Sequence, residues 1–381
     1  MKILIAIDSF KGSISSLEAG NSVKEGILRV IPDANCIVKP LADGGEGTAE
    51  AFVSGLGGEW VHLSICGPYG EPTDAKYAYL SDKKQAILEM AEASGITISK
   101  RKEPLYATTF GVGEMILDAL KRGATSFLIG IGGSATNDAG LGMLTALGFD
   151  FLDTNGNPVD KFAKDLPNIQ SIDDTQVSPL LQNATIQVAC DVNNPLCGET
   201  GATYIYGGQK GVTDDMKPIL DGYVSHFADI TAKHFGIDKQ NQAGAGAAGG
   251  LGFALLSYLH ADMQSGIDLV LRELDLEQHI QNCDYVITGE GRLDAQTAMG
   301  KGPIGIAKMG KSAGATTIAF AGSILEGAKD CNQEGIDAYF PILQTICTLE
   351  EAMMPETTKT NLTNTAEQVF RLLMANKKSL F

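Results

Sequence analysis

Five clusters of glycine, serine and acidic residues could do chemistry in this sequence, and each follows a short apolar stretch of strand length. The clusters begin at Asp8, Asp43, Gly132, Asp191 and Gly289. Backbone N–H groups of glycine-rich turns bind phosphate without a positive side chain, particularly where a helix begins. The neighbouring carboxylates suit Mg²⁺, which is held by one or two carboxylates together with phosphate oxygens and water. The combination indicates phosphoryl transfer assisted by Mg²⁺.

Any one of these clusters could instead be an ordinary turn that caps a helix. Asp43 and Ser13, for example, are residue types that cap helices well. Repetition after five apolar stretches argues against that interpretation, because ligands of open α/β sheets bind just outside the carboxyl ends of the strands. The five clusters therefore predict one polar cleft.

Few basic residues accompany the clusters. Lys11, Arg292 and Lys301 are candidates to neutralise phosphate charge, although each could equally be an exposed side chain. Asp191 follows an apolar stretch, which favours a functional role over a turn that precedes Pro195. The five histidines lie singly and lack zinc-ligand spacing, so we expect no structural zinc site and interpret them as structural.

Two formal nucleotide-binding patterns occur, and neither is supported. Residues 305–312 match the P-loop pattern GxxxxGK[ST], but the match lies inside an expected helix and its strand follows instead of preceding it. Residues 244–249 match GxGxxG, but polar residues stand before the match where a strand is needed. An anion-binding helix start stays open at 244–249, whereas a Rossmann-type NAD site is not supported.

The composition excludes several classes of protein. The chain has 381 residues, of which 44% are hydrophobic and 20% charged, as in ordinary globular proteins. A net charge of −17 argues against nucleic-acid and anionic-membrane partners, since both need a basic surface. The 45 glycines lie in compact clusters and not in low-complexity linkers.

The lack of a recognisable targeting signal and the pattern of cysteines predict a cytoplasmic protein. No apolar stretch is long enough to span a bilayer, and the apolar N-terminal segment is too short for a signal peptide, so we expect the mature protein to begin at Met1. Seven cysteines form no CxxC pair, which predicts reduced thiols in the cytoplasm.

Apolar stretches alternate with helical patterns, which predicts an α/β fold. The N-terminal residues read strand, helix, strand, helix, an order typical of a parallel sheet with helices on both faces. From Gly57 short strands with turn signals indicate a mixed sheet, and the first pattern returns after Cys283. We therefore expect a discontinuous, doubly wound domain, residues 1–57 and 276–381, interrupted by an inserted α/β domain at 58–275.

At the clusters described above, the sequence resembles the bacterial glycerate kinase family of type 1. The resemblance covers nearly the whole chain, and its motifs occur in the family's order at residues 8–12, 42–47, 130–138, 190–192 with 194–196, 246–250, 288–291 with 294, and 300–303. One departure is Ala139, which stands where glycine is frequent. The resemblance implies a flavodoxin-like domain interrupted by a second domain, with the active site in the cleft between them.

The resemblance also implies an activity. Members of the family use ATP and Mg²⁺ to phosphorylate D-glycerate, many of them at the 2-hydroxyl, which gives 2-phosphoglycerate and ADP. The alternatives are the 3-hydroxyl, a related hydroxy acid, an NAD-linked oxidoreductase, or a non-catalytic nucleotide-binding protein. The expected partners are glycerate and ATP, with a possible homodimer, no nucleic acid and no membrane.

Three groups of site residues follow from the motifs. The predicted catalytic residues are Lys11, which holds phosphate, and Asp191 and Asp8, either of which orients the attacking hydroxyl and accepts its proton. The predicted Mg²⁺ ligands are Asp43, Glu290 and Asp294. The predicted substrate- and phosphate-binding residues are Ser9, Gly44, Gly45, Glu46, Ser134, Asn137, Asp138, Asn194, Gly249, Gly289, Gly291, Arg292 and Lys301.

Overall fold

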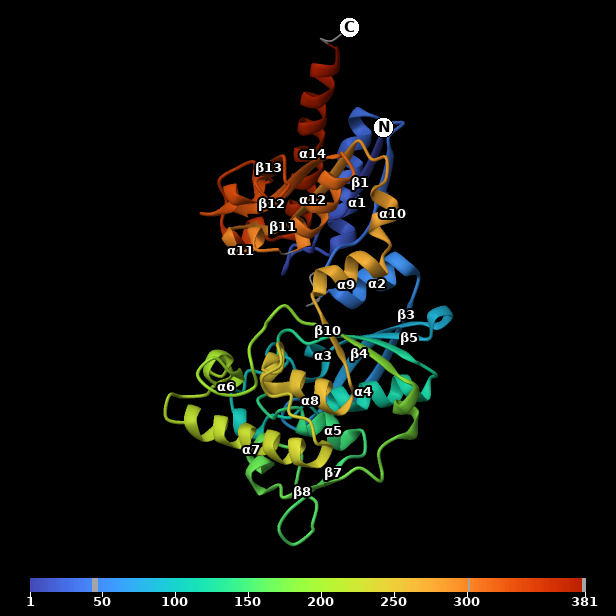
Figure 1. Ribbon diagram of the computed structural model, residues 1–381. Helices are drawn as coiled ribbons and strands as arrows, with labels where there is room; N and C mark the ends of the chain where they lie inside the picture. Colours follow the sequence, from blue (N-terminus) through green and yellow to red (C-terminus); the bar gives the residue numbers. More distant parts are fainter. Residues whose placement is uncertain (43–46, 301, 379–381) are drawn as a thin grey trace. The chain divides into compact units, whose positions relative to one another are not determined.

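The chain divides into two compact units. The computed structural model describes residues 1–42, 47–300 and 302–378, with side chains as far as residue 375. Unit 1 comprises Met1–Asp43, Glu50–Leu56 and Ile267–Phe381, and unit 2 comprises Gly44–Ala49 and Gly57–Gly266. Both ends of the chain thus contribute to unit 1, coloured blue and orange to red in Figure 1. The structure assigns residues 267–275 to unit 1, whereas the sequence prediction put them in the inserted domain.

Unit 1 contains a five-stranded parallel sheet. Its strands are β1 (Lys2–Ile5), β2 (Asn35–Val38), β11 (Tyr285–Leu293), β12 (Thr316–Ile324) and β13 (Ala338–Pro341). They lie in the order β13-β12-β11-β1-β2, and every neighbouring pair is parallel. Counted along the chain within the unit, this is the flavodoxin-like order 2-1-3-4-5. The predicted fold class is confirmed.

Helices cover both faces of this sheet, which explains its continuously apolar strands. One core joins Ile3 and Ile5 of β1 to side chains of α1 and α14, and another joins Ala319 of β12 to Ile304 of α12. The α-helices of the unit are α1 (Ser16–Val30), α2 (Thr48–Leu56, from its third residue), α9 (Gly266–Glu273), α10 (Leu276–Ile280), α11 (Ala295–Ala298), α12 (Gly302–Ser312), α13 (Leu349–Ala352) and α14 (Pro355–Lys378), with a 3₁₀ helix η7 (Ala328–Asn332).

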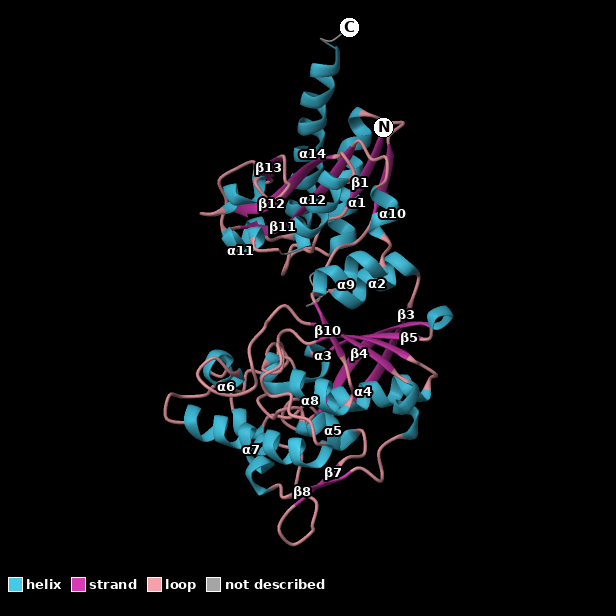
Figure 2. Cartoon of the chain, viewed as in Figure 1, coloured by secondary structure: helices cyan, strands magenta, loops and turns pink. Residues whose placement is uncertain are grey.

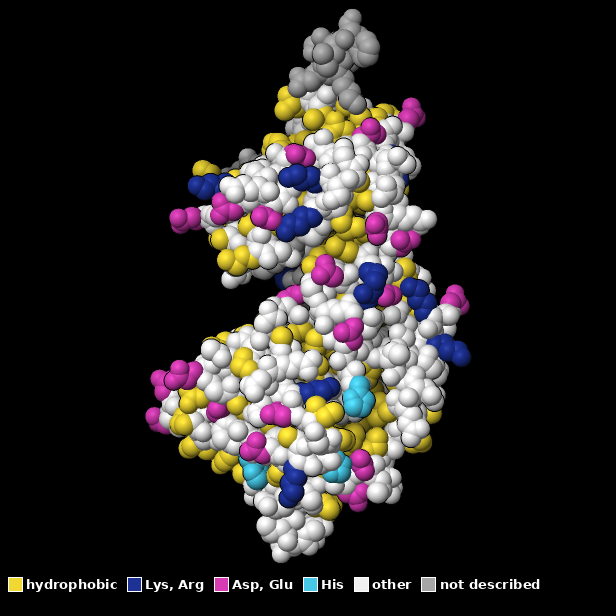
Figure 3. Space-filling view, viewed as in Figure 1, with side chains coloured by type: hydrophobic (Ala, Val, Ile, Leu, Met, Phe, Trp, Pro, Cys, Tyr) yellow, Lys and Arg dark blue, Asp and Glu magenta, His cyan; other side chains and the backbone are white. Residues whose placement is uncertain are grey.

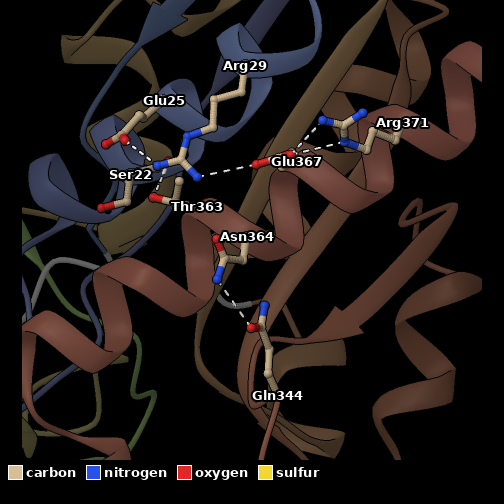
Figure 4. A network of polar contacts seen from close by, with 8 residues as sticks. All are labelled: Ser22, Glu25, Arg29, Gln344, Thr363, Asn364, Glu367 and Arg371. Atoms are coloured by element: carbon tan, nitrogen blue, oxygen red, sulfur yellow. Dashed lines mark hydrogen bonds and ion pairs between the residues drawn. The ribbon is translucent and has the colours of Figure 1, made fainter.

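The contact between α1 and α14 is close because Gly26 faces α14. A Cβ at Gly26 would lie 2.1 Å from the carbonyl oxygen of Thr363, so only glycine allows this approach. Around it, Thr363 donates to the carbonyl of Ser22 at 3.0 Å and Arg29 pairs with Glu367 at 3.3 Å (Figure 4). Such exposed ion pairs contribute about 0–1 kcal/mol each, so the close packing at Gly26 matters more for this pairing.

Unit 2 contains a six-stranded mixed sheet, as the sequence predicts. Its strands are β3 (Glu59–Cys66), β4 (Pro72–Leu80), β5 (Gln85–Glu89), β6 (Ser126–Gly130), β9 (Thr185–Ala189) and β10 (Asp262–Gln264). The order is β10-β9-β6-β5-β4-β3, parallel from β10 to β5 and antiparallel from β5 to β3. A separate antiparallel pair consists of β7 (Asp150–Leu152) and β8 (Ser171–Asp173).

The core of unit 2 lies between its large sheet and the helices that pack on it (Figure 2). The ring of Phe227 contacts the rings of Phe253 and Tyr258 there. The α-helices are α3 (Ala91–Ser94), α4 (Phe110–Lys121), α5 (Leu141–Ala146), α6 (Ala202–Tyr206), α7 (Lys217–Phe235) and α8 (Leu251–Tyr258). The 3₁₀ helices are η1 (Ser81–Lys83), η2 (Pro104–Tyr106), η3 (Ala163–Asn168), η4 (Pro179–Asn183), η5 (Gly208–Lys210) and η6 (Ala247–Gly250).

The negative charge is dispersed on the face of the molecule that Figure 3 shows. On the face shown in Figure 3, acidic side chains are scattered over both units with Lys and Arg between them. Among the described helices, the structure contains none long and apolar enough to cross a membrane.

Candidate active site

In unit 1, the predicted residues gather where β1 and β11 lie side by side. Pairing continues beyond the end of β1, since Asp8 N–H donates to the carbonyl of Gly289 at 2.9 Å. The strand order reverses between these two strands, and ligands of doubly wound sheets bind at this point, outside the carboxyl ends. Gly289 fits there because its φ is +154° and a Cβ would lie 2.0 Å from the carbonyl oxygen of Phe320.

Asp8 is buried at this edge. Its side chain accepts a hydrogen bond from Ser9 N–H at 2.6 Å, and only 4% of the residue is exposed. A Cβ built on Gly302, where α12 begins, would lie 3.8 Å from the other Asp8 oxygen. The Asp8 carboxyl group therefore lies near the start of α12, the end of a helix that favours negative charge.

The exposed Lys11 lies on a tight turn beside Asp8. Ser13 N–H donates to the carbonyl of Phe10 at 2.7 Å, and Gly12 has a φ of +80°. The turn approaches β11, since a Cβ at Gly291 would lie 4.0 Å from the backbone nitrogen of Lys11. The fold therefore brings together the first and fifth clusters of the sequence.

Glu290 and Asp294 are linked through the buried residue Thr297. The Thr297 hydroxyl donates to Glu290 at 2.6 Å, and Oδ1 of Asp294 accepts from Thr297 N–H at 3.2 Å. Asp294 thereby caps α11, and its Oδ2 pairs with Arg292 at 3.0 Å. The structure thus gives Asp294 and Arg292 a local structural role that the sequence did not predict, while their predicted ligand roles stay predictions.

In unit 2, the loop that follows β6 holds Ser134, Asn137 and Asp138. Asp138 is fully buried and accepts four hydrogen bonds, from the N–H and hydroxyl of Thr109 and from the N–H groups of Gly140 and Gly142. Burial raises the pKa of Asp138, and these donors oppose the rise. Three of these donors meet Oδ2 and one meets Oδ1, so the Asp138 carboxyl group organises the loop as a buried hydrogen-bond acceptor.

Asn137 is also fully buried in this loop. Its amide nitrogen donates to the hydroxyl of Thr203 at 3.1 Å. Within the described part of the chain, Oδ1 of Asn137 and Oγ1 of Thr136 have no hydrogen-bond partner. An unsatisfied buried polar atom lowers stability by about 1–3 kcal/mol. Two such atoms in one loop therefore favour a functional role for that loop.

Gly249 packs against the same loop. Its carbonyl accepts from Ala139 N–H at 3.0 Å, and a Cβ at Gly249 would lie 2.0 Å from the carbonyl oxygen of Thr136. Ala139 itself has a φ of +51°. A left-handed backbone costs a non-glycine residue about 1–2 kcal/mol, which explains why glycine is the better residue at position 139. Residues 237–246 form loops and turns ahead of Gly249, which agrees with the absence of a Rossmann motif here.

In the cluster after β9, Asp191 and Asn194 have different hydrogen-bond partners. Asp191 is exposed, and its Oδ1 accepts a hydrogen bond from Gly266 N–H at 3.0 Å. Asn194 donates to the carbonyl of Thr200 at 2.8 Å and accepts from the hydroxyl of Tyr206 at 2.6 Å. These two bonds give the Asn194 amide a role in holding its own loop.

Sequence reasoning missed two residues at the same edge of the unit 2 sheet. Glu89, at the end of β5, is 9% exposed and accepts from Ala49 N–H at 2.8 Å, at the start of α2. Lys210 is 2% exposed and donates to Oγ of Ser134 and to the carbonyl of Thr136, both at 2.7 Å. The available signals were an acid that ends an apolar strand and a lysine in a glycine-rich segment.

Five predicted residues lie outside the described residues, namely Asp43, Gly44, Gly45, Glu46 and Lys301. In the rest of the chain, the structure has no group of three or more His, Cys, Asp or Glu side chains placed to hold a metal ion. The match to the P-loop pattern lies within α12, as the sequence analysis predicts, because that helix spans Gly302–Ser312.

Comparison with known proteins identifies relatives over nearly the whole chain. A protein from Escherichia coli named glycerate 2-kinase is 45% identical over 92% of this chain and 93% of its own. A Bacillus subtilis protein named glycerate kinase is 47% identical over the same shares. The crystal structure of putative glycerate kinase 2 from Salmonella typhimurium is 41% identical, with a TM-score of 0.90 over 99% of both chains. The model of the glycerate kinase family matches residues 3–374. The chain therefore belongs to the glycerate kinase family.

Proposed function

We propose that this protein transfers the γ-phosphoryl group of ATP to the 2-hydroxyl of D-glycerate, giving 2-phosphoglycerate and ADP. The observation that carries the proposal is the near-full-length match to relatives that are named for this activity, one of which is named a glycerate 2-kinase. The glycine-rich and acidic strand ends of both units are consistent with it, since phosphoryl transfer depends on positioning and on neutralising charge.

The residues of unit 1 suit the phosphate end of this reaction. Lys11 is an exposed cation on a tight turn next to Gly291. We assign it to the phosphates of ATP, with Ser9, Gly289 and Gly291 around them. Either Asp8 or Asp191 is assigned to orient the attacking hydroxyl and accept its proton, and mutagenesis distinguishes the two.

Mg²⁺ is part of the proposal, and the donor set of unit 1 fits it. Glu290 and Asp294 are hard oxygen donors joined by Thr297, and Mg²⁺ prefers one or two protein carboxylates together with phosphate oxygens. Glu290 and Asp294 would hold the ion with Asp43, whose position lies outside the described residues. Bound there, Mg²⁺ would neutralise charge on the transferred phosphoryl group.

The proposed partners are small molecules. We retain glycerate and ATP as substrates, a cytoplasmic location on the grounds of the cysteine pattern, and a homodimer as a prediction for solution measurements. The negative surface raises the importance of Mg²⁺ and of backbone N–H groups, because both substrates are anions.

An assay of ATP turnover with D-glycerate tests the proposal. ADP formation that requires D-glycerate and stops when a chelator removes Mg²⁺ is expected, and phosphorus NMR should identify 2-phosphoglycerate. L-Glycerate and a longer hydroxy acid are the matched control substrates. No ADP formation would overturn the proposed function, whereas 3-phosphoglycerate would overturn only the assignment of the hydroxyl.

A further inference from the structure

Lys210 is a buried cation that holds the loop after β6 from the inside. Lys210 donates two hydrogen bonds to this loop, to Oγ of Ser134 and to the carbonyl of Thr136. Lys210 and Ser134 are separated by 76 positions in the sequence, so the contact belongs to the tertiary structure. The loop is the one that contains the buried Asp138.

Stability alone does not account for a lysine at this position. Burial lowers the pKa of Lys210 to about 7, and the negative charge of Asp138 opposes this. Removing a charge from water costs more than a buried pair usually returns, so apolar side chains of similar size are often as good or better for stability. The loop also leaves Oγ1 of Thr136 and Oδ1 of Asn137 unsatisfied within the described structure. A segment arranged only for stability would avoid both features.

The contact with Lys210 determines whether the Ser134 hydroxyl acts as a hydrogen-bond donor or acceptor. An ammonium group only donates hydrogen bonds, so Oγ of Ser134 is the acceptor in this pair. The hydroxyl must then donate its own proton to another group, and it becomes a stronger donor because the ammonium polarises it. Ser134 is 6% exposed and therefore buried, and it follows the exposed residues Gly132 and Gly133.

We propose that Lys210 is a positioning residue that orients the Ser134 hydroxyl as a hydrogen-bond donor to an anionic oxygen of a bound substrate. This inference rests on the proposed function, because the anion is either the carboxylate of glycerate or a phosphate of ATP. Lys210 acts through Ser134 and does not contact the substrate itself.

A double-mutant cycle tests the proposal. The variants are Lys210→Met, Ser134→Ala and the double variant, and the measurements are kcat and the KM values for glycerate and ATP. Loss of a hydrogen bond to a charged group should raise one of the two KM values about tenfold in each single variant. The KM that changes identifies the anion. If Lys210 acts through Ser134, the double variant should be no worse than the worse single variant.

A matched control and a second measurement complete the test. Lys239 is a half-buried lysine of the same unit that donates to the carbonyl of Leu256 at 2.7 Å, and Lys239→Met should leave both KM values unchanged. If Lys210→Met fails to fold, the proposal is tested by the pH dependence of the KM values of the wild type and of Ser134→Ala. The ratio of their KM values should fall from about tenfold below pH 7 toward one above pH 8, as the Lys210 ammonium facing Asp138 loses its proton.

Three results would overturn the inference. The first is a KM increase in the double variant that equals the product of the two single increases. The second is unchanged KM values in Ser134→Ala. The third is a ratio between the KM values of Ser134→Ala and the wild type that does not vary with pH. If the wild type phosphorylates glycerate in these experiments, the proposed function stands and only the role of Lys210 fails. A wild type without ADP formation would instead remove the proposed function and this inference with it.

Discussion

The backbone N–H of Gly266 donates a hydrogen bond of 3.0 Å to Oδ1 of Asp191. Gly266 is the first residue of α9, so a predicted catalytic carboxylate also stabilises the beginning of a helix. Negative charge is favourable at this end of a helix. Any test of Asp191 in catalysis must therefore separate its charge from its hydrogen bond.

Asp191→Asn makes that separation. The carboxamide oxygen can still accept from Gly266, so the melting temperature should change little, while a lost proton acceptor should lower kcat about 100-fold or more. Asp191→Ala, which removes both, should lower the melting temperature as well. Near-normal kcat in Asp191→Asn would exclude Asp191 as the base and direct the same test to Asp8.

Glu290→Gln tests the predicted Mg²⁺ site. The amide can still accept from Thr297, whereas an amide oxygen is a weaker ligand for a hard cation than a carboxylate. The Mg²⁺ concentration for half-maximal activity should rise about tenfold or more, as measured by titrating Mg²⁺ at fixed ATP. An unchanged requirement would remove Glu290 from the predicted ligands.

Asp294→Asn separates metal binding from helix capping. Asparagine caps helices as well as aspartate does, so α11 should persist and the melting temperature should stay close to that of the wild type. We expect a higher Mg²⁺ requirement, in line with the predicted ligand role. The same requirement as the wild type would limit Asp294 to capping α11 and pairing with Arg292.

Gly249→Ala tests how closely the loop after β6 is packed, with Gly236→Ala as its control. Both glycines have left-handed backbones, with φ of +68° and +71°, but a Cβ at position 236 meets nothing within 4 Å. Gly236→Ala should cost only the backbone strain of about 1–2 kcal/mol. Gly249→Ala should cost at least about 1–3 kcal/mol more through its clash with Thr136, and should lower activity. Chemical denaturation measures both, and equal losses would contradict the packing argument.

The pH dependence of stability reports on the buried Lys210. Because the folded state holds this amine with a pKa of about 7 and the unfolded state does not, the unfolded chain binds more protons above pH 7. Stability relative to Lys210→Met should therefore increase with pH from about 7 towards 10, by up to tenfold in the unfolding equilibrium constant per pH unit. Below pH 7 the difference between the two proteins should be constant. Denaturation curves at pH 6, 7, 8 and 9 check this, and a flat difference throughout would show that the amine stays charged.

Much of the fold could be predicted from local sequence. Parallel strands that are covered on both faces are continuously apolar, so stretches such as Ile3–Ile5 of β1 were recognisable, and the polar residues after them marked the strand ends. The boundary at residues 267–275 was harder, because the helix α9 looks the same in sequence whichever unit it packs against.

The candidate site divides along the same line. The sequence by itself determined which residue types stand at the strand ends, and with them the family resemblance and the chemistry of glycine-rich anion loops. Only the tertiary structure decided the partners that come from distant parts of the chain: Thr109 at Asp138, a helix start at Asp191, and the ammonium of Lys210 on Ser134. Neither periodicity nor spacing encodes the distance between two such side chains until the sheets and helices have packed.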